Sequence, residues 1–152
     1  MEIKFIEENK DIFVEPILRS LPEWFGIEES TQAYINGVKD KPLWVAFENE
    51  KPIGFISLKK HFKKSYEVYI MGLYPDFHGR GIGKRLLNDA ETYLKDLDVE
   101  LLQVKTLSDS SPDKNYGNTR HFYLSCGFEP LEEFKTLWDE WNPCLLLIKK
   151  LK

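Results

Sequence analysis

The sequence predicts a single-domain α/β protein that occupies residues 1–152. Strand-like and helix-like runs alternate along the chain, and near its middle a glycine-rich turn leads from a strand-like run into an amphipathic helix. The chain has 152 residues, of which 42% are hydrophobic and 30% charged. It is therefore large enough to bury a core and too apolar to be disordered.

The first third of the sequence predicts one strand followed by two helices. Residues 2–6 form a short strand-like run, and residues 10–21 and 28–39 have helical character. Pro16 falls inside the first helical segment, so we expect that helix to be kinked or to start late. The segment 22–26, Pro-Glu-Trp-Phe-Gly, separates the two helices.

The rest of the chain predicts six strands and two helices. Strands are expected at residues 43–47, 53–58, 66–74, 99–107, 128–134 and 144–150, with a hairpin turn at 48–51. One helix is expected at residues 84–95, and a second at 118–126 with Gly127 as its C-cap. The resulting order of elements is β-α-α-β-β-β-α-β-α-β-β.

The turn at residues 78–83, His-Gly-Arg-Gly-Ile-Gly, favours phosphate binding. Glycine lets the backbone approach a ligand closely, the first N–H groups of a helix have no partner within it, and the helix dipole favours an anion there. Arg80, Lys84 and Arg85 oppose that dipole, and a polyanionic ligand would reverse the sign of this effect. A tight strand–helix connection with solvated basic residues is the alternative interpretation.

Two common phosphate-binding loops do not fit the spacing. A Walker-type loop requires glycine at position 78 and Ser or Thr at position 85, where this chain has histidine and arginine. A dinucleotide fingerprint starting at position 79 or 81 requires glycine at position 84 or 86, which are lysine and leucine. Both loop types are therefore excluded.

The spacing [Gln/Arg]-x-x-Gly-x-[Gly/Ala] does fit, with His78, Gly81 and Gly83 at its fixed places. With Leu-Tyr-Pro at 73–75, the turn resembles the acetyl-CoA pyrophosphate loop of the GNAT superfamily of N-acetyltransferases. Residues 122–128, Phe-Tyr-Leu-Ser-Cys-Gly-Phe, resemble the family's late helix and the strand after it. The chain is identified as a single-domain, bacterial-type member, and the resemblance covers essentially its whole length.

The resemblance implies the acyl-CoA N-acyltransferase fold, a mixed and mostly antiparallel sheet with helices on both faces. It also implies acetyl-CoA as cosubstrate and CoA as product. Loop N–H groups would hold the pyrophosphate, and the end of the preceding strand would pair with the pantetheine arm as an added strand does. The expected cofactor-binding residues are Gly72, Leu73, His78, Gly79, Arg80, Gly81, Ile82, Gly83, Lys84, Tyr116 and Asn118.

Two parts of this set depart from the family pattern. His78 stands where the family has Gln or Arg, and we expect a small effect on CoA affinity because this place contributes mainly through its backbone. Tyr116 stands where the family has an asparagine that helps to hold the cofactor, as in a bacterial subgroup with Tyr-x-x-Thr-Arg-x-Phe-Tyr. Either Tyr116 or Asn118 replaces that contact or it is lost, and Asn118 could instead be a helix N-cap.

Acetyl transfer to an amine requires a base, because a primary ammonium with a pKa of about 10.4 must lose a proton before it attacks a thioester. Glu67 is the candidate base, because its place eleven residues before His78 resembles that of the glutamate in the histone-acetylating branch of the family. Strand alternation would give Glu67, Tyr69 and Met71 one face and Ile70 the other. A base formed by ordered water, with Glu67 merely solvated, is the alternative.

Tyr123 is the candidate acid, since it matches the family's late-helix tyrosine whose phenol donates a proton to the departing CoA sulfur. A purely structural aromatic residue is the alternative. Phe122 shares a helix face with Cys126 and is the residue of this pair that we expect in the core.

In this fold the acceptor pocket is shaped by two segments, here residues 21–29 and 137–142. Both combine aromatic rings with carboxylates, which suits a cation, so we expect a small and positively charged amine as acceptor. The expected substrate-binding residues are Trp24, Phe25, Tyr69 and Trp138. Tryptophans that plug the sheet edge, with solvated acids around them, are the alternative.

Charge and cysteine content exclude several other classes. The net charge of −4 and the lack of a basic run argue against nucleic-acid binding. No apolar run has the length of a membrane span and the N-terminus has no signal-peptide pattern, so we expect a cytoplasmic protein without a membrane partner. Cys126 and Cys144 show no metal-ligand spacing, so we expect neither a metal nor a disulfide. A homodimer stays open.

The leading interpretation is an N-acetyltransferase of the acyltransferase class that transfers acetyl directly within a ternary complex. One alternative is a protein acetyltransferase acting on lysines or N-termini, which would need an open groove. The other is a non-catalytic acyl-CoA-binding sensor, which would need neither Glu67 nor Tyr123. The bulky side chains of Trp24 and Trp138 favour a closed pocket.

Overall fold

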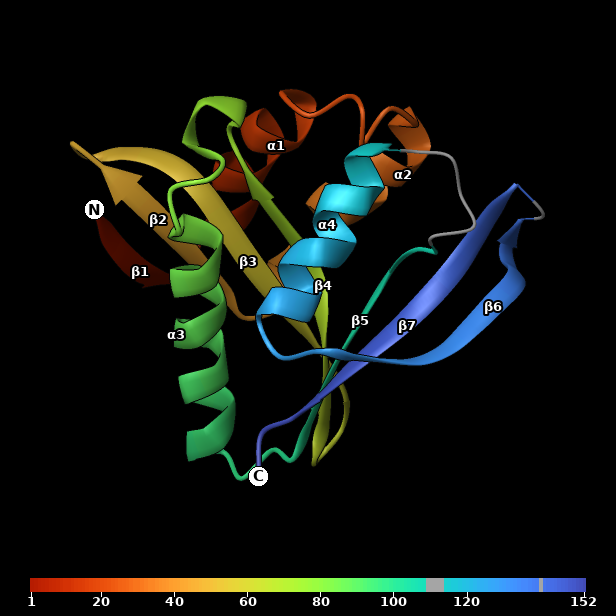
Figure 1. Cartoon of the computed structure of the whole chain (residues 1–152). Helices are drawn as coiled ribbons and strands as arrows, with labels where there is room; N and C mark the ends of the chain where they lie inside the picture. The colour runs from red at the N-terminus through yellow and green to blue at the C-terminus, as the bar shows by residue number, and fades with distance from the viewer. Residues whose placement is uncertain (109–113, 140) are drawn as a thin grey trace. The chain divides into compact units, whose positions relative to one another are not determined.

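A computed structural model describes residues 1–108, 114–139 and 141–152 (Figure 1). Its contacts define two compact units, one formed by Met1–Lys59 with Val68–Leu97 and the other by Lys60–Glu67 with Asp98–Lys152. The expectation of a single domain stays a prediction. The elements follow the predicted order: β1 (Glu2–Ile6), α1 (Lys10–Arg19), α2 (Glu28–Gly37), η1 (Val38–Asp40), β2 (Leu43–Glu48), β3 (Lys51–Phe62), β4 (Ser65–Leu73), η2 (Pro75–Phe77), α3 (Ile82–Asp96), β5 (Leu101–Leu107), α4 (Lys114–Ser125), β6 (Glu129–Asp139) and β7 (Asn142–Lys150).

The strands form a mixed sheet, as predicted. They hydrogen-bond in the order β1-β2-β3-β4-β5-β7-β6. The pairs β1–β2, β2–β3, β5–β7 and β6–β7 are antiparallel, whereas β4 and β5 run parallel. The β2–β3 hairpin turns through Asn49 and Glu50, whose φ angles of 51° and 67° are typical of a two-residue hairpin loop.

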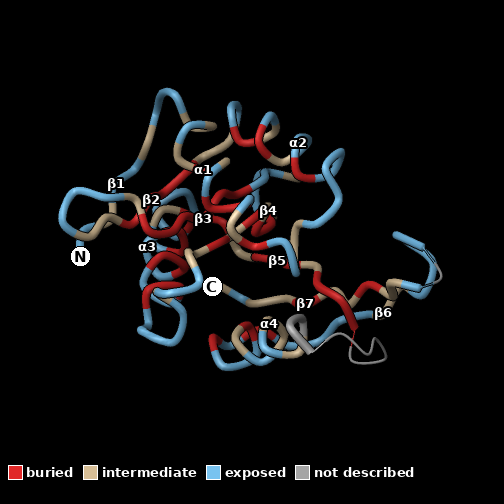
Figure 2. Tube along the Cα trace, turned by 90° about the horizontal axis from the view of Figure 1, so that it is seen from above, coloured by how far each residue is buried: buried red, intermediate tan, exposed pale blue. Residues whose placement is uncertain are grey.

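In the first unit, helices cover both faces of the strands. Val45 belongs to the buried cluster that β2 forms with α1 and α2, whereas its neighbour Trp44 contacts Tyr93 of α3 at 5.1 Å between ring centroids. Because successive strand residues point to opposite faces, α1 and α2 lie on one face and α3 on the other. Figure 2 shows the buried positions in red along α1 and β2. The main cluster comprises Val14, Ile17, Leu18, Leu21, Ile35, Val38, Leu43, Val45, Phe55 and Ile70.

In the second unit, α4 is tied to the strand β5. The Arg120 guanidinium donates through Nη1 to the carbonyl oxygens of Leu107 and Ser108, at 2.8 and 3.0 Å. The helix ends before Gly127, whose φ of 96° and N–H bond to Leu124 confirm the predicted C-cap. None of the helices in the described ranges is long and apolar enough to cross a membrane.

Several predicted boundaries are wrong. Helix α1 begins at Lys10 and contains Pro16, so the helix does not start late; it ends at Arg19, two residues early. Helix α4 begins at Lys114, so Asn118 lies inside it and is not an N-cap. Polar residues such as Asn118 favour helix starts only on average, and here the helix extends past one. Strand β6 runs to Asp139, which makes most of the predicted acceptor loop strand.

Burial along strand β4 alternates from Val68 to Leu73, since Val68, Ile70 and Gly72 are buried and the residues between them are half-buried. Ile70 belongs to the buried cluster of α1 and α2, and Gly72 faces the same side, since a Cβ there would lie 3.3 Å from Phe55 and 3.4 Å from Ile17. Tyr69 also packs against this cluster. The expectation that Tyr69 and Met71 share one face and Ile70 the other stays a prediction.

Candidate functional site

The glycine-rich turn has a backbone that only glycine adopts easily. Gly79 and Gly81 have φ angles of 74° and 77°, and Gly81 is the N-cap of α3. A Cβ at either glycine would meet no atom within 4 Å. Packing therefore does not require glycine at these two places, whereas backbone conformation does, and the space beside them is open to a ligand.

The start of α3 has the electrostatic properties of an anion site. No side chain caps the helix and no acidic residue lies in its first turn. The leading N–H groups have no partner inside the helix and carry the positive end of its dipole. Lys84 and Arg85 are exposed in this turn, and Arg80 lies 5.0 Å above the Phe77 ring. Their charge and the uncapped helix start suit an anion such as a diphosphate, and the assignment of these residues to the cofactor stays a prediction.

His78 joins the turn to the end of β4. Its Nε2 lies 3.0 Å from the carbonyl oxygen of Leu73, and because that oxygen can only accept, Nε2 donates. Its ring meets Trp24 edge to face, with centroids 6.0 Å apart. The side chain is exposed.

The end of β4 itself is closely packed. Leu73 fills the space beside Gly54 of β3, where an added Cβ would lie 2.6 Å from the leucine Cδ2 and 3.1 Å from the Gly72 carbonyl oxygen. Gly54 therefore brings the two strands close at the segment expected to bind pantetheine. Sequence reasoning missed Gly54, because its role depends on a neighbouring strand.

Of the two residues expected to replace the family asparagine, Asn118 is exposed on α4. Tyr116 lies in the first turns of the same helix, and its side chain is outside the described residues. The assignment of either residue to the cofactor stays a prediction.

Tyr123 is buried in the second unit. Its ring contacts Phe122 and Phe128 at centroid distances of 5.2 and 5.4 Å. Burial, with a smaller effect of Cys126, raises the pKa of the phenol well above its ordinary range, so the hydroxyl keeps its proton. Phe122 is only half-buried, so Tyr123 rather than Phe122 is the core residue of this pair.

Glu67 is also buried, and the side chains of His61 and Lys105 contact its carboxylate. His61 of β3 places Nε2 2.6 Å from its Oε1, and Lys105 of β5 places Nζ 3.4 Å from both carboxyl oxygens. The parallel register pairs Glu67 with Gln103, which puts Lys105 on the same face two residues further on. Sequence reasoning missed His61 and Lys105, since only the strand pairing brings them to the glutamate.

The residues expected at the acceptor pocket fall into two groups. In the first unit, Phe25, Tyr34 and Tyr69 form a chain of edge-to-face rings, at 6.1 and 5.3 Å, and the Lys41 ammonium lies 4.3 Å above Tyr69. Trp24 lies next to Phe25 in the turn that both make back to the carbonyl of Leu21. Tyr34 and Lys41 were missed. In the second unit, Trp138 is partly exposed on β6 rather than in a loop.

Comparison with known protein families decides the assignment. A family model described as the acetyltransferase (GNAT) domain matches residues 39–130. The chain belongs to the GNAT acetyltransferase family. It is therefore an N-acetyltransferase by family, as the sequence predicted. Comparison with curated proteins gives no significant match.

Solved structures of GNAT acetyltransferases share the fold. A GNAT-family protein of Desulfovibrio desulfuricans superposes with a TM-score of 0.83 at 16% identity, covering 99% of this chain and 100% of its own. The aminoglycoside 6'-N-acetyltransferase of Enterococcus faecium gives 0.79 at 17% identity, covering 100% and 98%. A GNAT acetyltransferase of Elizabethkingia anophelis with bound acetyl-CoA gives 0.74 at 19% identity, covering 98% and 97%.

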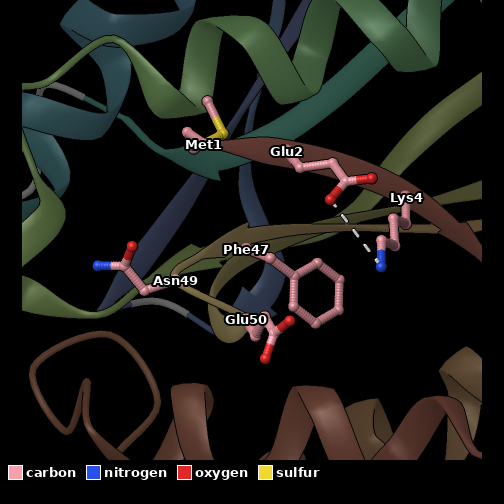
Figure 3. A pocket seen from close by; sticks show the side chains of 6 residues that line it. All are labelled: Met1, Glu2, Lys4, Phe47, Asn49 and Glu50. Atoms are coloured by element: carbon pink, nitrogen blue, oxygen red, sulfur yellow. Dashed lines mark ion pairs between the residues drawn. The ribbon is translucent and has the colours of Figure 1, made fainter.

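A hollow of about 410 Å³ elsewhere on this GNAT chain contains none of the predicted site residues. It lies beside β1 and the β2–β3 turn, where Glu2 and Lys4 form an ion pair and Lys4 also lies 5.2 Å from the Phe47 ring (Figure 3). The residues that line it include no histidine, cysteine or hydroxyl side chain for chemistry. We assign it no role.

Proposed function

We propose that this GNAT protein transfers the acetyl group of acetyl-CoA to the primary amine of a small acceptor, with both substrates bound at once. The observation that carries the proposal is the pair of positive-φ glycines, 79 and 81, at the uncapped N-terminus of α3 with open space beside them. Similar structures that contain CoA or acetyl-CoA support the same cosubstrate.

The cofactor half of the proposal uses the backbone and the charges of the loop. The N–H groups of residues 79–84 would bind the pyrophosphate, with Arg80 and Lys84 close in sequence to add charge. The end of β4, Gly72 and Leu73, would hydrogen-bond the pantetheine arm. Bound acetyl-CoA supplies an activated acyl group.

The catalytic half uses one base and one acid. Glu67 takes a proton from the acceptor ammonium, and the freed amine attacks the thioester carbon. An N–C bond forms and the C–S bond breaks, so that the electron pair leaves on sulfur as a thiolate. As the amide forms, its nitrogen releases a second proton, which balances the proton that the thiolate takes up. The hydroxyl of Tyr123, kept protonated by burial, donates a hydrogen bond to that thiolate and can give it a proton.

For the acceptor we propose a small and positively charged amine. Trp24, Phe25 and Tyr69 supply ring surface, and acidic side chains are frequent around them in sequence. Glu28 is not free for this task, since Arg19 binds both its oxygens at 2.8 and 3.0 Å. A contribution from Trp138 remains part of the proposal. Three of the similar structures are aminoglycoside 6'-N-acetyltransferases, which makes aminoglycosides natural members of a test panel.

The test combines calorimetric titration of acetyl-CoA with a thiol-release assay against polyamines, aminoglycosides, amino acids and lysine peptides. Micromolar binding and turnover on cationic small amines would support the proposal in full. A preference for anionic amines would refute the charge assignment, and turnover on peptides alone would favour a protein acetyltransferase. Binding without turnover on any amine would favour the sensor, and lack of binding would refute the cofactor assignment.

A further inference from the structure

The buried carboxylate of Glu67 lies in a cluster of side chains from three neighbouring strands. A buried general base requires partners of this kind. The Glu67 side chain is 11% exposed, and its partners come from β3 on one side and β5 on the other. Burying a carboxylate without partners costs several kcal/mol, so an unpaired glutamate here would tend to take up a proton and stay neutral. A buried glutamate therefore needs partners of this kind if it is to act as a base at neutral pH.

Lys105 and His61 satisfy that condition in different ways. The Lys105 ammonium is equidistant from the two carboxyl oxygens, at 3.4 Å each, and so compensates the charge of the whole group. His61 makes one short contact, 2.6 Å from its Nε2 to Oε1. A lysine keeps its charge at neutral pH, whereas a histidine can gain or lose a proton there, so the two partners have different chemistry.

His61 also reaches solvent. Its side chain is 27% exposed, against 11% for the glutamate that it contacts. An imidazole can accept a proton on one ring nitrogen and release another from the opposite nitrogen, which is the chemistry of a proton shuttle. Nε2 of the ring thus contacts the buried oxygen of Glu67, while the His61 side chain as a whole is partly exposed.

We propose that His61 carries to solvent the proton that Glu67 removes from the acceptor, while Lys105 compensates the charge of the Glu67 carboxylate. This inference rests on the proposed function. The ammonium N–H bond breaks as an O–H bond forms on Glu67. That proton then passes to Nε2 of His61, and the Nδ1 proton of the ring passes to water. No electrons are transferred. The ring is left with its proton on Nε2, and exchange of that proton for one on Nδ1 through water restores the tautomer that accepts the next proton.

Cys144 of β7 is a further titratable group that interacts with this cluster. Burial raises the pKa of its thiol, Lys105 acts in the opposite direction and Glu67 raises it. The raised pKa keeps Cys144 protonated at neutral pH, so it does not compete for the proton. The charges of the cluster affect Cys144, but its thiol takes no part in the proton transfer.

The test compares kcat from pH 6 to pH 9 for His61→Gln, His61→Ala and a control, His121→Gln, whose exposed histidine lies on α4 away from the cluster. Glutamine can still donate a hydrogen bond to Glu67 but cannot shuttle a proton. We expect a fall in kcat of about tenfold or more for His61→Gln, with unchanged acetyl-CoA affinity. Added imidazole should restore turnover in His61→Ala, since it can occupy the vacated space.

Lys105→Met provides the second arm, with Lys150→Met on the exposed end of β7 as its control. Loss of Lys105 should lower kcat about tenfold or more, whereas the control should not, because the buried carboxylate loses its charge compensation. Unchanged kcat in His61→Gln across the pH range, or no response of His61→Ala to imidazole, would overturn the relay while wild-type turnover kept the transferase proposal intact. A wild-type protein inactive on every amine would overturn both.

Discussion

The imidazole of His78 donates a hydrogen bond to the carbonyl oxygen of Leu73, five residues earlier, over 3.0 Å. The first residue of the glycine turn is thereby fixed to the last residue of β4. One hydrogen bond of this kind contributes about 1 kcal/mol. The two segments expected to bind the pyrophosphate and the pantetheine arm are thus linked by a single side chain.

Replacing His78 tests this link. We expect His78→Ala to raise the acetyl-CoA dissociation constant about threefold to tenfold, the equivalent of roughly 1 kcal/mol. Glutamine can also donate to the Leu73 carbonyl, so His78→Gln should retain most of the affinity. Calorimetric titration of both variants measures the effect. Equal losses in the two variants would show that the ring itself, and not its hydrogen bond, is what matters.

Substitution of Gly81 separates backbone strain from ligand exclusion. At a φ of 77°, any side chain costs roughly 1–2 kcal/mol, so Gly81→Ala and Gly81→Glu should both lower the melting temperature by a few degrees. Only the glutamate adds a negative charge at the phosphate site. We expect acetyl-CoA affinity to fall at least about tenfold further in Gly81→Glu than in Gly81→Ala. Similar affinities in the two variants would argue against a phosphate at this position.

Tyr123→Phe removes the proposed acid and leaves the ring. The ring packing against Phe122 and Phe128 should survive, so the fold and acetyl-CoA binding should be retained. We expect kcat to fall by about a hundredfold, the lower end of what a positioned acid contributes. Steady-state kinetics at several pH values measures it, and turnover equal to wild type at every pH would rule the acid role out.

Burial of Tyr123 also predicts how stability changes at alkaline pH. Its pKa is raised in the folded state, so between the unfolded and folded pKa values the native protein binds more protons than the unfolded chain. The free energy of unfolding therefore decreases as pH rises above about 10. Urea unfolding at pH 8 and pH 11 should show a smaller decrease for Tyr123→Phe than for wild type. An identical decrease would mean that the phenol ionises freely in the folded protein.

Gly37 makes room for the Tyr69 phenol. A Cβ at this position would lie 2.1 Å from Tyr69 Oη, although the φ of −68° suits alanine. Gly37→Ala should therefore displace the tyrosine ring with little backbone strain. If Tyr69 binds the acceptor, the acceptor KM should rise several-fold while acetyl-CoA affinity is unchanged. Asn36→Ala, at the exposed neighbouring position, is the control, and an unchanged KM would remove Tyr69 from the pocket.

Much of this fold follows from local sequence. Residues 2–6 form a strand and the glycine turn is followed by a helix, as predicted, because both have a local signal, and the helix has one buried face at helical spacing. The glycine turn before α3 was predictable for the same reason, since spacing within six residues defines it, and its binding of phosphate stays a prediction.

The parts that could not be predicted depend on pairing between distant segments. Lys105 reaches Glu67 only through the register of β4 with β5, and His61 only through the extension of β3 beyond its apolar run to Phe62. A one-residue change of register would move every such contact to the other face, so sequence periodicity does not determine it.

The lysine above the Tyr69 ring has a consequence for substrate choice. Lys41 is held there by its own bonds to the Gly37 carbonyl and to Asp40, at 2.7 and 3.0 Å. The Lys41 ammonium therefore competes with any substrate ammonium that approaches the Tyr69 ring. Because Lys41 belongs to the same chain, it is present at a high effective concentration. A monoamine has only one charge with which to displace it. An acceptor with several amino groups can bind the protein through its other amino groups at the same time. We therefore expect polyamines to compete with Lys41 more effectively than monoamines do.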